Sequence, residues 1–406
     1  MESRRFRLRS LAVNVYLPTL CFAFGEGLVL PVLPLFAREL GASLAMVGLV
    51  VTLRGIGALT ADLPAGVLVS RFGGRTAMLV SAAWAAAAAL LVAFAQSDDQ
   101  LAALLFVAGI GWSMWLVSRL AYVSDNVPSE YRGRALALVG GVHRAGVFAG
   151  PVAGGLIADA FGLRAAFLAQ AVAAALAGAA VLAYREPTAP PVRQRGPAHA
   201  RIVATLQRHR RDFLTAGFVA VSLVVVREAR QLLVPLWGDH VGLGVAEIGF
   251  VMGLGSALDM TLFLPVGFVM DRWGRKWTIV PSLLLLGLGS VLLTLTSNFP
   301  TLLAVGLLFG WGNGLGSGAV MTLGSDLAPR ANSGEFLGVW RFVSDLGRVA
   351  GPTFVGGVAQ AGSLAAASLV AGFVAWLGAA VMLFFVAETL RRADVVVPVA
   401  NEDERT

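Results

Sequence analysis

Charged side chains occur inside several long apolar stretches of this sequence. A buried carboxyl group can take up and release a proton, and a buried arginine can hold a carboxylate or a phosphate. These residue types therefore predict proton exchange and ion recognition. No nucleophile–base pair or metal-ligand spacing accompanies them, so we expect neither an enzyme nor a metal or cofactor site. The embedded acids are Glu26, Asp62, Glu228, Asp259 and Asp345, and the embedded arginines are Arg54, Arg119, Arg144, Arg227, Arg230, Arg341 and Arg348.

Spacing predicts partners for some of these charges. Glu26 and Arg54 should lie at similar depth in successive membrane spans, where they can pair. Arg341, Asp345 and Arg348 follow one helical face, so Asp345 can bond both arginines. One interpretation of these groups is purely structural ion pairing. The other is proton coupling, for which Glu26 is our first choice and the further candidates are Asp62, Asp259 and Asp345.

The same reasoning predicts a substrate cavity that combines charge with aromatic surface. Four tryptophans offer faces on which an apolar substrate could stack, with ordinary helix packing as the alternative. The predicted cavity residues are Glu26, Arg54, Trp112, Trp115, Arg144, Arg227, Arg230, Trp311, Trp340, Arg341, Asp345 and Arg348.

The composition requires a lipid environment for these stretches. Of 406 residues, 57% are hydrophobic and only 14% are charged, whereas soluble domains carry about 25% charged residues. The 48 glycines suit closely packed membrane helices. The single cysteine, Cys21, excludes an intrachain disulfide and a cysteine-based metal site. The net charge of +7 lies in loops and does not indicate nucleic-acid binding.

The chain contains a long internal repeat. Gly66, Arg71 and Gly73 recur as Gly267, Arg272 and Gly274, an offset of 201 positions (267 − 66). The same offset relates Asp125 to Asp326, and Gly150-Pro151 to Gly351-Pro352. A period this long indicates a duplicated half-protein, and in a membrane chain two such halves predict a transporter with its site at their interface.

The sequence contains twelve apolar stretches that are long enough to cross a bilayer. We expect them to be helices, because backbone groups in lipid must be hydrogen-bonded internally. The predicted spans are 11–36, 45–69, 76–96, 101–123, 135–159, 164–184, 213–236, 246–270, 277–297, 300–323, 334–360 and 363–387.

Arginine-rich loops predict the orientation of these spans. Positive residues gather in alternate loops, which places both termini in the cytoplasm. We expect a multi-pass protein of the inner (plasma) membrane and no cleaved signal peptide. The predicted segments are a basic tail (1–10), a six-helix half (11–184), a basic cytoplasmic linker (185–212), a second six-helix half (213–388) and a cytoplasmic tail (389–406).

Two six-helix halves with glycine-rich basic turns resemble the major facilitator superfamily. The turn after the eighth span matches the family pattern at Gly267, Asp271, Arg272, Gly274, Arg275 and Lys276; in the first copy Ser70 replaces the acid. The resemblance implies twelve helices, with spans three, six, nine and twelve at the periphery, and those spans carry no embedded charge. It also implies a gating role for Gly66, Arg71, Gly73, Arg75, Arg119, Asp125, Gly267, Asp271, Arg272, Gly274, Arg275 and Asp326.

The fifth span carries a second family pattern, which is characteristic of exporters that run as antiporters. Gly146, Gly150 and Gly154 form one smooth helical face next to Pro151 and Gly155, and we expect this face to admit a close helix neighbour. One departure is notable. Proton-linked drug exporters of the family usually place an arginine four residues before a Gly-x-Gly in span four, and here that position is Leu105.

These features predict a secondary active transporter, namely a proton-coupled exporter of hydrophobic or amphipathic small molecules that works by alternating access. Its expected partners are a small-molecule substrate, protons and the lipid bilayer, and we expect a monomer. An alternative is a transporter of an organic anion or lipid headgroup, because embedded arginines outnumber embedded acids. An alternative of another class is a membrane sensor that does not transport.

Overall fold

The computed structural model describes residues 12–183, 207–329 and 333–390, and within these ranges all regular structure is helical. The predicted tail at 1–10, residues 185–206 of the predicted linker and residues 391–406 lie outside the described residues.

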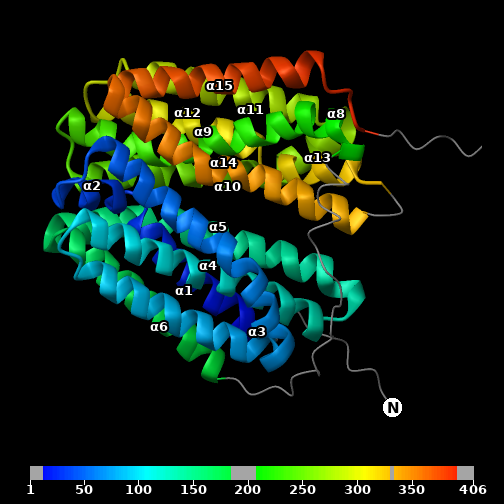
Figure 1. Ribbon diagram of the computed structural model, residues 1–406, viewed down its shortest axis with the longest axis horizontal. Coiled ribbons are helices and arrows are strands. Elements are labelled where there is room, and N and C mark those ends of the chain that lie inside the picture. The colour runs from blue at the N-terminus through cyan, green and yellow to red at the C-terminus, as the bar shows by residue number, and fades with distance from the viewer. Residues whose placement is uncertain (1–11, 184–206, 330–332, 391–406) are drawn as a thin grey trace, which may run out of the picture.

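The first half of the chain forms the lower bundle in Figure 1. Serine side chains begin two of its helices: Ser43 and Ser97 each accept a hydrogen bond from a backbone N–H in the first turn. The elements are the π-helix η2 (Ala12–Tyr16), α1 (Leu17–Val29), α2 (Val32–Glu39), α3 (Leu44–Ala93), α4 (Asp98–Asn126), α5 (Ser129–Phe161) and α6 (Leu163–Ala183).

The second half forms the upper bundle. Asn298 and Ser363 cap two of its helices in the same way. The elements are α8 (Arg210–Asp212), the π-helix η3 (Phe213–Gly217), α9 (Phe218–His240), α10 (Val245–Trp273), α11 (Lys276–Leu293), α12 (Phe299–Leu315), α13 (Ala319–Leu327), α14 (Ser333–Ala361) and α15 (Leu364–Phe384).

Ten helical segments of the described chain are long and apolar enough to cross a membrane. The two predicted spans missing from that set correspond to α9 and α14. With 23 and 29 residues, both are long enough to cross. They also carry the densest embedded charge, Arg227, Glu228 and Arg230 on α9 and Arg341, Asp345 and Arg348 on α14. The all-helical, two-half fold predicted from the sequence is therefore confirmed.

Two predicted spans are interrupted. The first span breaks after Val29, where Pro31 lacks the N–H that would continue α1, and the chain restarts as α2. The tenth span breaks between Leu315 and Ala319, where Gly318 has a positive φ of 72°. Broken helices occur inside membranes only where they are buried in protein or line a cavity, so we expect both breaks to lie inside the protein or beside a cavity.

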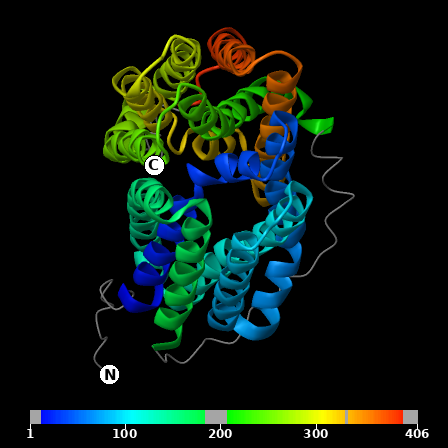
Figure 2. The ribbon, with the colours of Figure 1, turned by 90° about the vertical axis from the view of Figure 1, so that its left-hand side faces the viewer.

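The two halves meet at the end of the bundle that holds α2, where α3 packs on α14 and α5 packs on α10 (Figures 1 and 2). Thr52 Oγ1 donates to the Val349 carbonyl at 2.8 Å, and Thr353 Oγ1 donates to Thr52 Oγ1 at 2.7 Å. Leu44 N also donates to Gln360 Oε1 at 3.1 Å. These hydrogen bonds join the halves at this end.

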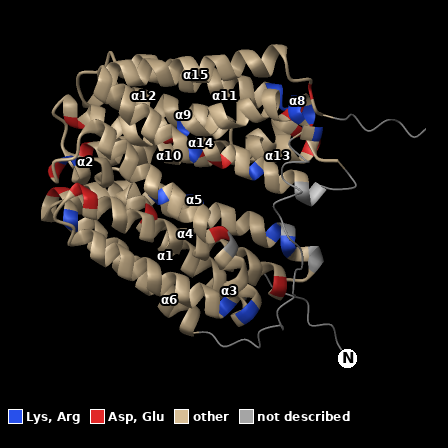
Figure 3. Ribbon diagram, viewed as in Figure 1, with Lys and Arg blue, Asp and Glu red and all other residues tan. Residues whose placement is uncertain are grey.

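At the opposite end the same four helices diverge (Figure 1). A Cβ added at Gly66, Gly140, Gly267 or Gly338 would have nothing within 4 Å. Basic residues gather at this end, while acids are frequent near α2 (Figure 3). The basic side chains include Arg71, Arg75, Arg272, Arg275 and Lys276. The structure is thus closed at the α2 end and separated at the basic end.

Candidate functional site

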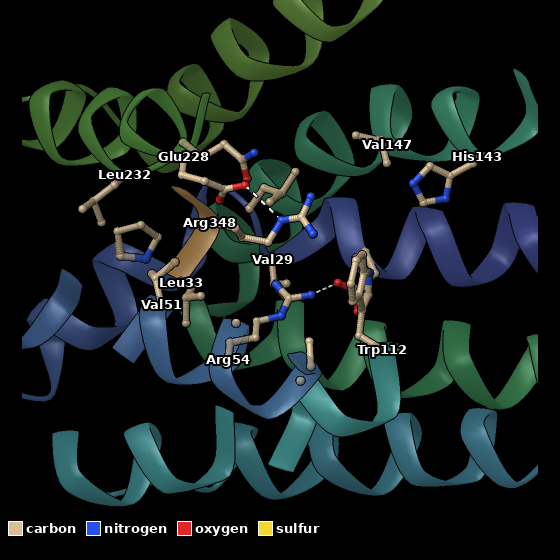
Figure 4. A pocket seen from close by; sticks show the side chains of 17 residues that line it. Val29, Leu33, Val51, Arg54, Trp112, His143, Val147, Glu228, Leu232 and Arg348 are labelled. Carbon is tan, nitrogen blue, oxygen red and sulfur yellow. Dashed lines mark ion pairs between the residues drawn. The ribbon is translucent and has the colours of Figure 1, made fainter. Parts of the chain in front are cut away.

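A cavity of about 300 Å³ lies between the two halves. Residues of α1, α2, α3, α4 and α5 form its wall on one side, and residues of α9 and α14 form the other. Much of the wall is aliphatic, including Val29, Leu33, Val51 and Leu232, and Figure 4 shows charged side chains projecting among them. The cavity thus combines apolar surface with a few charged groups, as small-molecule sites do.

The first half contributes an ion pair to this cavity. Arg54 Nη2 on α3 contacts Glu26 Oε2 on α1 directly. Gln170 Nε2 on α6 also donates to Glu26 Oε1 at 3.1 Å. The structure therefore contains the pairing predicted for Glu26 and Arg54, and it adds an amide donor that sequence reasoning missed. Gln170 lies in the sixth predicted span, whose interior carries no charge, and a polar residue in that apolar interior could have indicated this contact.

The second half contributes a chain of alternating charges. Arg348 Nε lies 3.6 Å from Glu228 Oε1, and Arg348 Nη1 lies 3.1 Å from Asp345 Oδ1. Arg341 Nε lies 3.6 Å from Asp345 Oδ2. Asp345 thus bonds both arginines of its helix, as the spacing predicted. Arg348 also stands 5.6 Å from the ring centre of Trp112, which belongs to the other half.

A second cavity of about 160 Å³ adjoins the first, and the two share Leu30, Val147 and Gln231 in their walls. Its polar wall includes Arg230, Ser256, Asp259 and Asn313. The break in span ten lies beside it, because Asn313 and Ser317 flank the end of α12. The predicted uninterrupted span gave no indication of this polar compartment.

Arg144 on α5 joins the halves beside this second cavity. Its Nη1 lies 3.4 Å from both carboxylate oxygens of Asp259 on α10, and its Nη2 donates to Ser317 Oγ at 2.5 Å. The guanidinium also lies 4.6 Å from the ring centre of Phe263. Asn313 Nδ2 donates to Asp259 Oδ2 at 2.9 Å. Asp259 is therefore held by one charged and one neutral donor.

Asp62 and Arg119, two further embedded charges of the first half, have separate surroundings. Ser113 Oγ donates to Asp62 Oδ1 in a very close contact. Arg119 is 6% exposed, and among the described residues no carboxylate lies within ion-pair distance of it. Ser113 is a further contact that charge patterning did not reveal. The structure therefore offers no Asp62–Arg119 pair.

Only one of the four predicted cavity tryptophans lines the described cavities. Trp112 lies in the wall of the larger cavity. Trp115 is 2% exposed and stacks on Phe22 with ring centres 4.4 Å apart, inside the first bundle. Trp340 is 3% exposed and donates to the Val320 carbonyl at 2.8 Å. Trp311 is 52% exposed. In contrast to the prediction, two of these three rings pack inside a bundle and the third is exposed. A helix has several faces, and only one of them meets the cavity.

The glycine face of span five packs closely, as predicted, and its main neighbour is α1 of the same half. A Cβ added at Gly146 would lie 2.8 Å from Phe24 N, and one at Gly150 would lie 2.6 Å from the Gly27 carbonyl carbon. Gly154 packs on the Leu28 backbone. Pro151 remains within the helix. Gly155 differs from these three, because it contacts α10 of the other half.

The basic turns lie at the separated end. Both turn at a glycine with positive φ, 80° at Gly73 and 110° at Gly274. Arg275 donates two hydrogen bonds to Asp326, from Nε to Oδ2 at 2.6 Å and from Nη2 to Oδ1 at 3.2 Å. Position 74 of the first copy is glycine, so Asp125 has no equivalent arginine and is exposed. Arg75 instead donates to the carbonyls of Val181 and Leu182. Asp271, Arg71 and Arg272 are exposed, as expected while the halves are apart.

Glu388 lies at the basic end of the molecule, and the sequence analysis did not identify it as a site residue. Its carboxylate accepts from Arg275 N at 2.9 Å and Lys276 N at 3.1 Å, where α11 begins. Partial burial raises the pKa of Glu388, but backbone N–H donors of Arg275, Lys276, Leu390 and Thr389 outweigh it and lower the pKa. An acid just after the last predicted span was the feature that could have indicated this contact, but Glu388 lies 113 positions from Arg275 in the sequence.

Similar solved structures support the fold. The nucleoside transporter NupG has a TM-score of 0.75 and 14% identity, covering 92% of this chain and all of that chain. A D-xylose–proton symporter has a TM-score of 0.72 and 14% identity, covering 94% of this chain and 98% of that chain. At this identity the likeness concerns the fold alone.

Sequence comparison identifies the family. Multidrug resistance protein 1 of Bacillus subtilis is 25% identical over 364 residues, covering 88% of this chain and 90% of that protein. Multidrug resistance protein MdtG of Citrobacter koseri is 27% identical over 347 residues, covering 82% and 84%. The sequence profile of the Major Facilitator Superfamily matches residues 15–263 and 229–401. The chain is therefore a multi-pass membrane transporter that belongs to the Major Facilitator Superfamily.

Proposed function

We propose that this transporter is a proton-coupled exporter of hydrophobic or amphipathic small molecules. The observation that carries the proposal is the cavity between the halves, whose apolar wall includes one ion-paired carboxylate from each half, Glu26 and Glu228. The resemblance to multidrug resistance proteins supports the direction of transport and the class of substrate.

Glu26 is the proposed proton carrier. When Glu26 is ionised, Arg54 and the Gln170 amide stabilise its charge. A substrate entering the cavity beside this pair would draw Arg54 away or exclude water, and either change favours the protonated carboxyl. Proton binding and substrate binding are then linked through one side chain. Asp62, Asp259 and Asp345 are the alternative carriers.

Alternating access would use the helices that already touch at one end. α3, α5, α10 and α14 approach through small residues at the α2 end and diverge at the basic end. We propose that the halves rock so that the basic turns approach while the α2 end opens. The positive-inside rule favours a cytoplasmic location for the basic end, and on that basis we propose that the present arrangement corresponds to an inward-facing state in the plasma membrane. Arg144 and Asp259 would restrain that motion.

The test is transport by the purified full chain in liposomes. Fluorescent amphipathic compounds, including rhodamine 6G and dansylglycine, are presented with and without a pH gradient, and protein-free liposomes serve as the blank. We expect accumulation of some compounds against their gradient, abolished by nigericin. Movement that is independent of the pH gradient would contradict the coupling. A complete lack of transport by folded protein across the panel would contradict the exporter.

A further inference from the structure

Two arginines beside the smaller cavity lack carboxylate partners. Arg230 lines this cavity, and within the described ranges it makes no ion pair or hydrogen bond. Arg227 donates to the Asn313 carbonyl at 3.2 Å, and its Nε is buried without a partner. Charged groups within a membrane protein normally pair or face a pathway. Two neighbouring guanidinium groups without a direct carboxylate contact, one of them in the cavity wall, therefore need an explanation.

The nearby acids are already engaged. Asp259 is bound by Arg144 and Asn313, and Glu228 is bound by Arg348. Arg227 and Arg230 interact with these two carboxylates electrostatically, without a direct ion pair. Arg227 and Arg230 are the two arginines of this group that have no carboxylate in direct contact. Among the described residues, no further acid lies within ion-pair distance of either.

The remaining wall suits a small anion. The Asp259 carboxylate in this wall is paired with Arg144 and accepts from Asn313 Nδ2, and Ser256 Oγ donates to the Met252 carbonyl. The Gln231 amide and Arg230 remain as donors, and Arg230 supplies a planar fork that fits a carboxylate or a phosphate. A volume of about 160 Å³ accommodates a headgroup of that size and not a whole drug-like molecule. The adjoining larger cavity is mostly apolar and shares Leu30, Val147 and Gln231 with it.

We propose that the transported molecule is an amphipathic anion, whose acidic group binds Arg230 in the smaller cavity while its apolar part occupies the larger one. This inference rests on the proposed function and narrows its substrate class. It also assigns Arg230 as the residue that determines the preference for charge, because Arg230 lines the cavity and makes no direct ion pair or hydrogen bond with a described residue.

The experiment measures binding of three matched probes to the full chain in nanodiscs by fluorescence titration, with empty nanodiscs as the blank. Dansylglycine carries a carboxylate, dansylglycinamide is neutral, and dansylethylenediamine carries an ammonium group. We expect dansylglycine to bind at least tenfold more tightly than either of the others. The expected preference shrinks to less than threefold in Arg230→Gln, while affinity for the neutral amide is unchanged. Arg230→Lys should retain part of the preference.

Arg211→Gln is the matched control, because Arg211 is an exposed arginine outside both cavities. Thermal unfolding of each variant checks that it is folded. Equal or tighter binding of the ammonium probe, an unchanged preference in Arg230→Gln, or no saturable dansylglycine binding would overturn the inference. Proton-coupled transport of other compounds with no anion preference would defeat this inference alone. Anion-selective binding without proton coupling would defeat the proposed function alone.

Discussion

Gly155 and Gly249 lie against each other across the boundary between the two halves: a Cβ added at Gly155 would lie 3.1 Å from Gly249 Cα. The contact recurs by the internal repeat, since Gly356 and Gly48 occupy the equivalent positions and a Cβ at Gly356 would lie 3.0 Å from Gly48 Cα. Two symmetric glycine contacts therefore close the α2 end. Only residues without side chains allow backbones to approach this closely.

Gly155→Leu should open the α2 end. The leucine side chain would separate α5 from α10 without disturbing the packing of α5 on α1, so the protein should remain folded while transport falls at least tenfold. Transport rate at matched membrane abundance is the measurement. Gly140→Leu is the control, because Gly140 lies on the same helix and a Cβ added there would have nothing within 4 Å. Equal transport by both variants would show that the contact has no role in gating.

Gly150→Leu should have a different effect. Gly150 packs on Gly27 inside one half, so a leucine there overpacks the bundle, which typically costs about 1–3 kcal/mol. We expect insertion into the membrane, loss of transport and a lower unfolding temperature, compared with Gly140→Leu. Thermal unfolding in detergent separates this packing effect from the gating effect at Gly155. If Gly150→Leu unfolds at the same temperature as Gly140→Leu, the close packing of α5 on α1 at Gly150 does not contribute to stability.

Glu388 should stabilise the start of α11 in a pH-dependent way. Its pKa is lowered in the folded protein, so its contribution is complete above the ordinary value of about 4.5 and is lost as the pH falls through the lowered pKa. Glu388→Gln should cost about 0.5–1 kcal/mol at pH 7, a small effect because the site is open to water. Thermal unfolding at pH 7 and pH 4 is the measurement, with Glu39→Gln as control. A difference that grows towards low pH would contradict this assignment.

The repeat and the embedded charges predicted much of the architecture. Residues such as Gly66 and Gly267 marked the two halves, and the i, i+4, i+7 spacing of Arg341, Asp345 and Arg348 predicted contacts that the structure contains. The charge contacts could be predicted because they depend on helical periodicity, which is local, and the two halves could be recognised because the repeat is visible in the sequence itself.

Contacts between elements were harder to predict. The breaks at Pro31 and Gly318 depend on packing around them, and apolar length alone made each span look continuous. Trp115 and Trp340 were assigned to the cavity because hydropathy does not say which face of a buried helix meets a neighbour. The Arg144–Asp259 contact joins residues 115 positions apart in different halves, so no local pattern indicates it.

The orientation of the chain is predicted from charge and can be tested directly. In a Cys21→Ser background, Gln96→Cys lies in the loop before α4 and Arg272→Cys lies in the basic turn. We expect a membrane-impermeant maleimide to label position 96 from outside intact cells and position 272 only after permeabilisation. The reverse pattern would overturn the cytoplasmic assignment of the basic end and make the structure outward-facing.

The central claim is that a cavity carboxyl couples proton movement to substrate movement, and Glu26→Gln tests it most directly. Glutamine keeps the size of the side chain and can still bond Arg54 through its carbonyl oxygen, but it cannot titrate. In liposomes, uphill substrate export driven by a pH gradient should be lost, while substrate counterflow without a gradient should remain within about threefold of the unaltered protein. Uphill export with unchanged pH dependence would contradict the account and move the coupling site to Asp62, Asp259 or Asp345.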